Sequence, residues 1–387
     1  MNIIESTLQL LENTAKEQGF LVYSRGGAIP YLTPDIFQNI FKKEHTVWHI
    51  PVSTVYEQPG ESVLKKYGKT FKEFASLSDC TLIFNTNDSS QPKEDLFKYN
   101  EEKATSVWAP SGRRRISPDE YMSVLKTFGI NICIPPSDQI PCGVGKKRCQ
   151  KSCDRSVRFL DRCLEIRKEQ NLDIPVFGVL EGGESIPYRQ KCAKEIIKRN
   201  VDGYVLSGLD VIGPEWMDVL KGTLEYLQDE KIKIMFGLFT PIEVVKAMLV
   251  GIHLFDSVIC SITAERGCAL NFNFDLKTNY KDTTISVPIK KVKQQEDEKE
   301  KILRKDLSAF EMNLHCDEYT EDMNPLVVGC SCYCCTRYTR AYLHHLLVTK
   351  EMLSEVLLMV HNLHHWKSFF QHLKKYRDNS ALGDLLK

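Results

Sequence analysis

The chain has 387 residues, 42% of them hydrophobic, and its 51 Lys and Arg residues are balanced by 51 Asp and Glu residues. A net charge of zero excludes a free-standing polyanion binder, which normally carries a basic excess, so any contact with RNA has to be local. The length suits one large domain with an appendage.

The cysteine content and the apolar segments point to a compartment. Fourteen cysteines without a secretory signal indicate a reducing environment. The helical pattern over residues 1–19 contains Glu5, Glu12 and Glu17, unlike an Arg-rich transit peptide. No apolar run approaches the ~18–20 residues that span a bilayer. We therefore expect a cytoplasmic protein with no transmembrane segment.

Strand-like runs alternate with helical patterns along most of the chain. The first strand is predicted at 21–24, before a helix that opens at Thr33 and Pro34, a good N-cap followed by a good first helical residue. Further strands are predicted at 131–135, 174–180, 203–207, 232–238 and 254–259. This alternation predicts an α/β fold with a parallel sheet, and periodicity alone allows either a (β/α)8 barrel or a doubly wound sheet.

Two basic clusters lie in the middle of the chain and could neutralise RNA phosphates. An equally simple interpretation is a solvated loop balanced by nearby acids. The candidate phosphate contacts are Arg113, Arg114, Arg115, Lys146, Lys147 and Arg148. The cysteines at 142, 149, 153 and 163 fit no zinc spacing, and we interpret those of the helical stretch 149–163 as small buried thiols.

The segment 290–306 is almost continuously charged, which is typical of a solvated connection. Beyond it, Cys330, Cys332 and Cys335 form a Cys-x-Cys-x-x-Cys loop, and His361 follows on an apolar helical segment. Thiolate and imidazole are the preferred ligands of tetrahedral zinc, so this spacing predicts a structural zinc site. Cys334 is then the odd thiol. Spacing alone leaves four other imidazoles as alternatives to His361, namely His344, His345, His364 and His365.

Long motifs around this loop resemble the tRNA-guanine transglycosylases. These motifs are Asn324-Pro325-Leu326-Val327, the cysteine loop, Thr339 to Leu346 and His361-Asn362-Leu363. The resemblance spans about residues 21–370 and selects His361 as the fourth zinc ligand. It also implies a (β/α)8 barrel at 1–310, with a charged connection near 290–306, and a zinc-binding helical subdomain at 311–387, holding one structural Zn²⁺ per chain.

Within the resemblance, the residues of the barrel mouth match the family unevenly. Asp256 of Phe-Asp-Ser stands at the nucleophile position, and Asp138, Glu181 and Gly208 stand at base-contacting positions. The Asp-Ser-Gly-Gly turn that carries the family's second carboxyl has become Asp88-Ser89-Ser90-Gln91. The base-recognising glutamine has become Glu181, and a carboxylate accepts hydrogen bonds where an amide also donates. An arginine that follows the nucleophile in the family is absent from Cys260-Ser261-Ile262. Exchange chemistry needs two carboxyl groups, so the chain alone is predicted to be inactive.

The resemblance therefore implies a non-catalytic subunit that forms a heterodimer with a catalytic transglycosylase. The pair would exchange guanine for queuine at the wobble position of tRNAs with GUN anticodons, those for aspartate, asparagine, histidine and tyrosine. Two interpretations compete with it, a self-sufficient transglycosylase that uses Asp256 and a zinc-stapled scaffold without RNA contact. A homodimer in isolation and peripheral association with the mitochondrial outer membrane are further family-level expectations. The candidates for exposed apolar anchors that meet the partner are Tyr342, Leu346, Leu347 and Trp366. The alternative for each is that its side chain packs inward on the cysteine loop.

Overall fold

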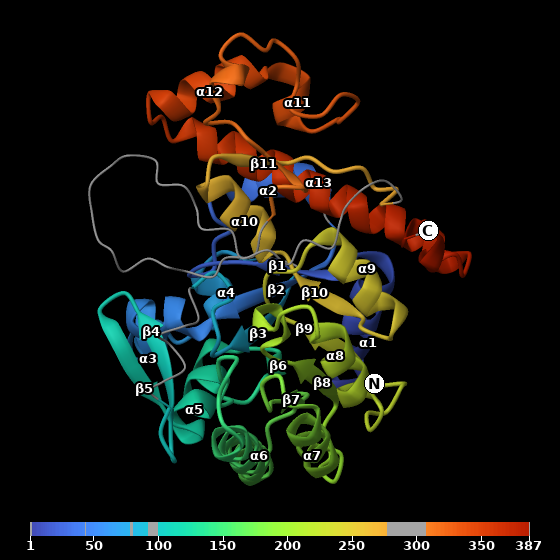
Figure 1. The fold of residues 1–387 in the computed structure, drawn as a ribbon. Helices are drawn as coiled ribbons and strands as arrows, with labels where there is room; N and C mark the ends of the chain where they lie inside the picture. The colour runs from blue at the N-terminus through green and yellow to red at the C-terminus, as the bar shows by residue number, and fades with distance from the viewer. Residues whose placement is uncertain (1, 43, 78–79, 92–99, 277–306, 387) are drawn as a thin grey trace.

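The computed structural model describes residues 2–42, 44–77, 80–91, 100–276 and 307–386. Its centre is an eight-stranded sheet in the order β6-β3-β2-β1-β10-β9-β8-β7, and every neighbouring pair is parallel. A parallel bridge between Cys133 and Val176 joins the two outer strands, so the sheet closes on itself. The predicted (β/α)8 barrel is confirmed (Figure 1).

The barrel strands are β1 (Phe20–Tyr23), β2 (Thr46–Pro51), β3 (Cys80–Asn85), β6 (Ile132–Cys133), β7 (Phe177–Leu180), β8 (Gly203–Leu206), β9 (Lys233–Met235) and β10 (Leu254–Asp256). Strands β2 and β3 were not predicted from the sequence. The strand predicted at 254–259 is too long, because the chain turns after Asp256 and α10 begins at Val258.

The helices that surround the barrel are α2 (Pro34–Phe41), α3 (Glu61–Tyr67), α4 (Phe71–Phe74), α5 (Pro118–Phe128), α6 (Lys146–Glu169), α7 (Ile186–Ile196), α8 (Trp216–Leu224), α9 (Pro241–Leu249) and α10 (Val258–Glu265). Several start on the same local signal. Ser117 and Thr240 cap α5 and α9, each with a proline at the first helical position and a glutamate at the third that bonds back to the cap. Such caps satisfy backbone N–H groups that have no partner within the helix.

The interior of the barrel is apolar through most of its depth. Alternate strand residues point inward, because side chains along a strand alternate between the two faces. The inward residues include Leu21, Val47, Ile83, Ile132, Phe177, Val205, Ile234 and Leu254. Helix α1 (Ile3–Glu17) contributes Leu11 and Ala15 to the same cluster. The next inward residues toward the carboxyl ends of β1, β2 and β10 are Tyr23, His49 and Asp256, so polar groups begin there.

Further strands and helices lie outside the barrel. A hairpin, β4 (Thr105–Ala109) with β5 (Gly112–Ile116), extends from the loop after β3. Strands β11 (Cys268–Leu270) and β12 (Glu311–Asn313) pair on either side of the segment 290–306, which lies outside the described residues. The carboxyl-terminal part is helical, as the resemblance implies, with α11 (Tyr333–Arg337), α12 (Arg340–Val348) and the long α13 (Leu353–Asp378).

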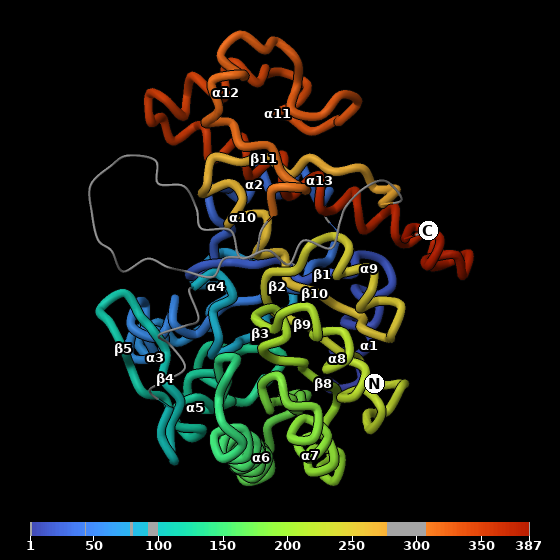
Figure 2. The backbone as a smooth tube through the Cα atoms, in the orientation of Figure 1, coloured from blue at the N-terminus to red at the C-terminus, as the bar shows by residue number. Residues whose placement is uncertain are grey.

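Helix α13 joins the carboxyl-terminal elements to the barrel (Figure 2). Phe370 lies against Phe20 of β1 and Phe255 of β10, with ring centroids 5.1 and 6.2 Å apart. Lys374 pairs with Glu17 of α1 at 2.5 Å. No helix among the described residues is long and apolar enough to cross a membrane.

Candidate functional site

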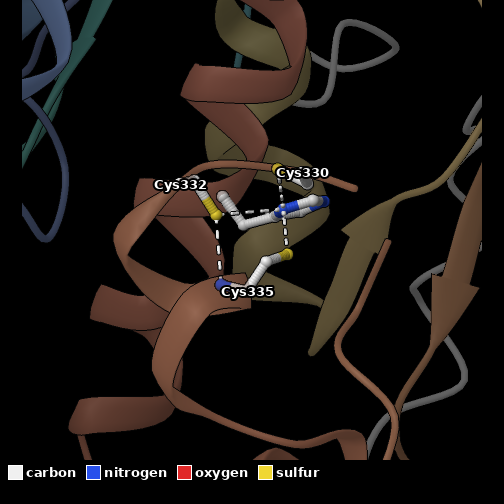
Figure 3. Close-up of side chains that lie close together, drawn as sticks. Cys330, Cys332 and Cys335 are labelled. Carbon is white, nitrogen blue, oxygen red and sulfur yellow. Dashed lines mark hydrogen bonds between the residues drawn. The ribbon is translucent and has the colours of Figure 1, made fainter. Parts of the chain in front are cut away.

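Four side chains from two distant segments converge beside β11. The sulfurs of Cys330, Cys332 and Cys335 lie 3.8, 3.5 and 3.3 Å from Nδ1 of His361, and all four candidate ligand atoms lie within 4.8 Å of one another. A tetrahedron with metal bonds of about 2.0–2.3 Å has edges of about 3.3–3.8 Å. Figure 3 shows the three labelled cysteines with their sulfurs around one imidazole ring. The cluster could therefore hold a metal ion.

Contacts within the cysteine loop, residues 330–335, hold the sulfurs in position and favour a thiolate. Cys332 caps α11, its sulfur accepting from the backbone N–H of Cys335 at 3.2 Å. Hydrogen bonds from Cys332 and Cys335 lower the pKa of Cys330, which favours the thiolate that binds metals. Burial raises the pKa of Cys334, which stays a protonated thiol outside the cluster.

His361 is oriented by a backbone partner. Its Nε2 lies 2.8 Å from the carbonyl oxygen of Leu270, so Nε2–H donates there and Nδ1 faces the sulfurs. Such a second bond fixes the tautomer of a metal-binding histidine. The neighbouring Asn362 accepts from Leu270 N–H at 2.7 Å and donates to the carbonyls of Cys260 and Cys268 at 3.2 Å. The motif around His361 thus locks α13 to β11 and α10.

The four alternative imidazoles are not part of the four-residue cluster. His344 bonds the Leu314 carbonyl at 2.8 Å, and His345 is exposed on α12. His364 lies 3.7 Å from Cys330 and also contacts Ser331, outside the four-residue cluster. His365 is wedged against Phe272, and burial lowers its pKa to about 3, so it is neutral.

At the carboxyl ends of the barrel strands, Asp256 is paired within the protein. Its Oδ2 lies 3.1 Å from Nδ1 of His49 on β2, and both side chains are fully buried. The His49 ring packs against Phe236 and the edge of Tyr23, at centroid distances of 4.5 and 5.8 Å. The carboxylate predicted to stand at the nucleophile position is thus paired with a histidine inside the barrel.

Asp88, which the resemblance compares with the family's second carboxyl, also accepts hydrogen bonds within the chain. Its Oδ1 accepts from the Tyr23 hydroxyl at 2.9 Å and from the N–H and hydroxyl of Ser90 at 2.9 and 2.8 Å. Burial and then Asp88 raise the pKa of Tyr23, which remains a donor. Arg25 in turn donates to the Tyr23 oxygen at 3.1 Å. Asp88 therefore serves as the acceptor of a fixed network.

Glu181 lies at the end of β7, completely buried. Burial raises its pKa to about 7, although Arg189 and hydrogen bonds from Ser207 and Ser137 oppose the rise. The Ser137 hydroxyl donates to Glu181 at 2.8 Å. The buried Arg189 donates to three backbone carbonyls, those of Gly183, Leu180 and Ser207, and so staples the loops after β7 and β8.

Asp138 follows β6, and its carboxylate accepts hydrogen bonds from two arginines of α6. Arg148 donates through both terminal nitrogens, Nη1 to Oδ2 and Nη2 to Oδ1, each at 2.7 Å. Arg155 donates to the same Oδ2, and Asn100 donates to Oδ1 at 2.9 Å. The Asp138 side chain has no solvent exposure. The Asp138 carboxylate, which was predicted to contact a base, is therefore already paired with donors of its own chain.

The space near these residues is small. One cavity of about 20 Å³ is lined by Asp88, Asn100 and Gln139 among others, and another of about 10 Å³ by Gln139, Ser207 and Gly208 among others. A single water needs about 10–15 Å³ on this measure. Each of these two cavities has room for about one water molecule on that measure.

Comparison with known proteins assigns the architecture to a family. The profile of the queuine tRNA-ribosyltransferases matches residues 6–385. The chain belongs to the queuine tRNA-ribosyltransferase family. It is similar to proteins named queuine tRNA-ribosyltransferase accessory subunit 2: 33% identity to that of Gallus gallus over 95% of this chain and 89% of the relative, 32% to that of Homo sapiens over 97% and 92%, and 30% to that of Trichoplax adhaerens over 98% and 94%.

In this member of the queuine tRNA-ribosyltransferase family, the two basic clusters differ. Arg113 and Arg115 of β5 both pair with Glu101, at 3.2 and 3.1 Å, and Arg114 pairs with Glu57. Lys146 and Lys147 are exposed at the start of α6 and form no ion pair among the described residues. Arg148, predicted as a phosphate contact with them, turns to Asp138 and is 28% exposed.

The residues predicted to anchor the partner differ in their exposure to solvent. Trp366 and Leu346 are 1% and 5% exposed, so the prediction is wrong for them, because both pack into the core. Tyr342 is exposed, and its ring stacks on Tyr338 with centroids 5.4 Å apart.

Some residues of this family member's barrel mouth were missed. His49 gave no signal, because β2 was not identified. Arg155 was noted only for its position close behind the basic cluster 146–148, and nothing in the spacing tied it to Asp138.

Proposed function

We propose that this chain is a non-catalytic subunit of a queuine tRNA-ribosyltransferase and works as a heterodimer with a catalytic subunit. The main observation behind the proposal is that the carboxylates at the mouth of the barrel are already bonded to other side chains of this chain. Asp256 bonds to His49, Asp88 to Tyr23 and Asp138 to Arg148. Base exchange needs a free nucleophile, a second carboxyl for proton transfer and room for a purine. The names of the relatives agree with this role.

The cluster of Cys330, Cys332, Cys335 and His361 is proposed to hold one structural zinc ion per chain. Three thiolates and one imidazole suit zinc, and four protein ligands leave no open position for catalysis. The ion would tie the cysteine loop to α13, and His361 in turn reaches β11 through Leu270. No cysteine of the described residues forms a disulfide, which supports the proposed cytoplasmic location.

A surface beside this cluster is proposed to receive the catalytic subunit. Tyr333 and Tyr342 are 48% and 39% exposed, and Arg337 lies 4.4 Å from the Tyr333 ring centroid. Val348 at the end of α12 and Met352 just after it are also exposed, at 63% and 82%. Exposed tyrosine and arginine beside aliphatic side chains are typical of the energetic centre of a protein interface.

Contact with tRNA is proposed to involve Lys146 and Lys147. Helix α6 follows β6, so its first turn lies on the side of the barrel where the strands end. The start of a long helix adds a partial positive charge to the two lysines. This position would extend the phosphate-binding surface of a catalytic partner, for GUN-anticodon tRNAs as substrates.

Incorporation of labelled guanine or queuine into tRNA tests the proposal. The assay compares this chain alone, the catalytic subunit alone and the two together. We expect no turnover by this chain, and a complex that is more active than the catalytic subunit alone. Turnover by the lone chain that disappears in Asp256→Asn would establish a self-sufficient enzyme instead. Two chains that elute separately at micromolar concentration would refute the heterodimer.

A further inference from the structure

The contact between Arg148 and Asp138 has the shape of a ligand contact. Two N–H groups on the planar guanidinium of Arg148 meet the two oxygens of one carboxylate, each at 2.7 Å. We propose that Arg148 is a built-in occupant of the base position, which blocks the site to a free base. This inference rests on the proposed function only in taking the barrel mouth as a former base site.

The chemical argument is a match of donor patterns. The ring N–H and the neighbouring amino group of guanine form a planar pair of donors, as the guanidinium of Arg148 does. A carboxylate accepts either pair in the same bidentate way. Adenine and cytosine present a ring acceptor beside their amino group, so they do not match. Asp138 should therefore select the guanine-type edge once Arg148 is gone.

The surroundings would keep Asp138 charged and in place without Arg148. Arg155 is 2% exposed and donates to Oδ2, and Asn100 donates to Oδ1. The backbone of Asp138 is also fixed, because its N–H donates to Ser156 at 2.9 Å and its carbonyl accepts from Ser152 at 2.5 Å. Removing Arg148 thus withdraws one donor from each carboxylate oxygen and leaves the carboxylate paired.

The position of Arg148 also permits entry. Its side chain is 28% exposed in the first turn of α6, while Asp138 beneath it has no exposure. Asn100 and Gln139, beside Asp138, line the water-sized cavities at the mouth. Shortening Arg148 should widen the space beside Asp138. A single ring fits the enlarged site more readily than a purine, so isocytosine, which has the guanine-type edge on one ring, is the first probe.

The experiment measures binding of isocytosine, guanine and cytosine to the purified full-length chain by saturation-transfer NMR and calorimetry. The variants are Arg148→Ala and the control Arg162→Ala, which removes an arginine of the same helix that binds Asp119 at 2.7 Å on the surface. We expect no binding by the parent chain or Arg162→Ala. We expect Arg148→Ala to bind isocytosine and guanine at least about tenfold more tightly than cytosine.

A second readout uses guanidinium ion at millimolar concentration, which should raise the melting temperature of Arg148→Ala and leave that of Arg162→Ala unchanged. If Arg148→Ala does not fold, Arg148→Met, which keeps the aliphatic stem, undergoes the same measurements. A folded variant that binds no guanine-type edge, or a parent chain that binds as tightly as the variant, would overturn the inference. Base exchange is not measured, so failure of the proposed function would be recorded separately.

Discussion

The Oδ2 atom of Asp256 lies 3.1 Å from Nδ1 of His49, and neither side chain is exposed to solvent. Oδ1 of Asp256 and Nε2 of His49 have no hydrogen-bond partner among the described residues. Among the described residues, the Asp256 carboxylate therefore has one hydrogen-bond partner, His49, across the barrel interior. The residue predicted to stand at the nucleophile position is thus buried and paired within the chain.

Replacing Asp256 should therefore affect stability more than function. Asp256→Ala leaves the buried Nδ1 of His49 unpaired, which should lower the free energy of unfolding by ~1–3 kcal/mol in urea titrations. The control is Asp154→Ala, an exposed aspartate of α6. Exchange by the folded heterodimer should be unchanged. A loss of exchange without a loss of stability would instead give Asp256 a catalytic role.

Metal content should depend on Cys332 and not on Cys334. Cys332→Ser removes one of four ligands, and metal binding at such sites supplies folding free energy, so the variant should lose the metal and its ordered cysteine loop. Cys334→Ala is the matched control, because this neighbouring thiol lies outside the cluster. Elemental analysis of the parent chain should find one zinc per chain. A parent chain without stoichiometric metal would contradict the zinc proposal.

Asn362 should be structurally critical without being a ligand. Asn362→Leu leaves the Leu270 N–H and the carbonyls of Cys260 and Cys268 without their side-chain partner. We expect a loss of about 2–4 kcal/mol in the free energy of unfolding, since each unsatisfied buried group costs about 1–3 kcal/mol and relaxation recovers part of it. Zinc stoichiometry at saturating metal should remain one. Loss of metal with unchanged stability would contradict this assignment.

Glu181 should make the protein less stable as pH rises toward neutrality. Its pKa rises from an ordinary 4.5 to about 7 because of burial, so the folded state keeps a proton that the unfolded chain releases within that range. The stabilisation is full below about pH 4.5 and is lost as pH rises to 7. At about 1.4 kcal/mol per unit, the loss approaches roughly 3 kcal/mol. Glu181→Gln, whose amide resembles the protonated acid, should flatten this part of a denaturation series from pH 5 to 8. An unchanged slope would show that Glu181 is not its source.

Binding of tRNA should depend on Lys146 and Lys147 more than on the β5 arginines. Lys146→Glu with Lys147→Glu should weaken tRNA binding by the heterodimer and flatten its dependence on salt concentration, by up to about one unit of slope for each phosphate that the variant no longer neutralises. The comparison is Arg113→Glu with Arg115→Glu, which removes charges already paired with Glu101. Titrations at several salt concentrations measure both. A larger effect of the arginine pair would move the RNA surface to the hairpin.

Local patterns along the chain were enough to predict the class of fold and the three cysteines of the metal cluster. Alternating strands and helices indicate a parallel sheet because they depend on nearest neighbours, and the Cys330 to Cys335 spacing fixes three sulfurs in one short loop. The resemblance supplied the barrel and His361, which periodicity and spacing left open. β2 and β3 were missed, although both are fully buried strands of the barrel.

The state of the barrel mouth could not be predicted in this way, because it depends on contacts between distant residues. Asp256 and His49 are 207 positions apart, and Tyr23 and Asp88 are 65 apart. Arg148 and Asp138 are only 10 apart, but the charge pattern around Arg148 gave no direction to its side chain. Barrel closure brings the ends of all the strands together and so decides which carboxylates are free. The order of residues thus sets which reactive groups the chain carries, and the closed barrel sets which of them are already paired.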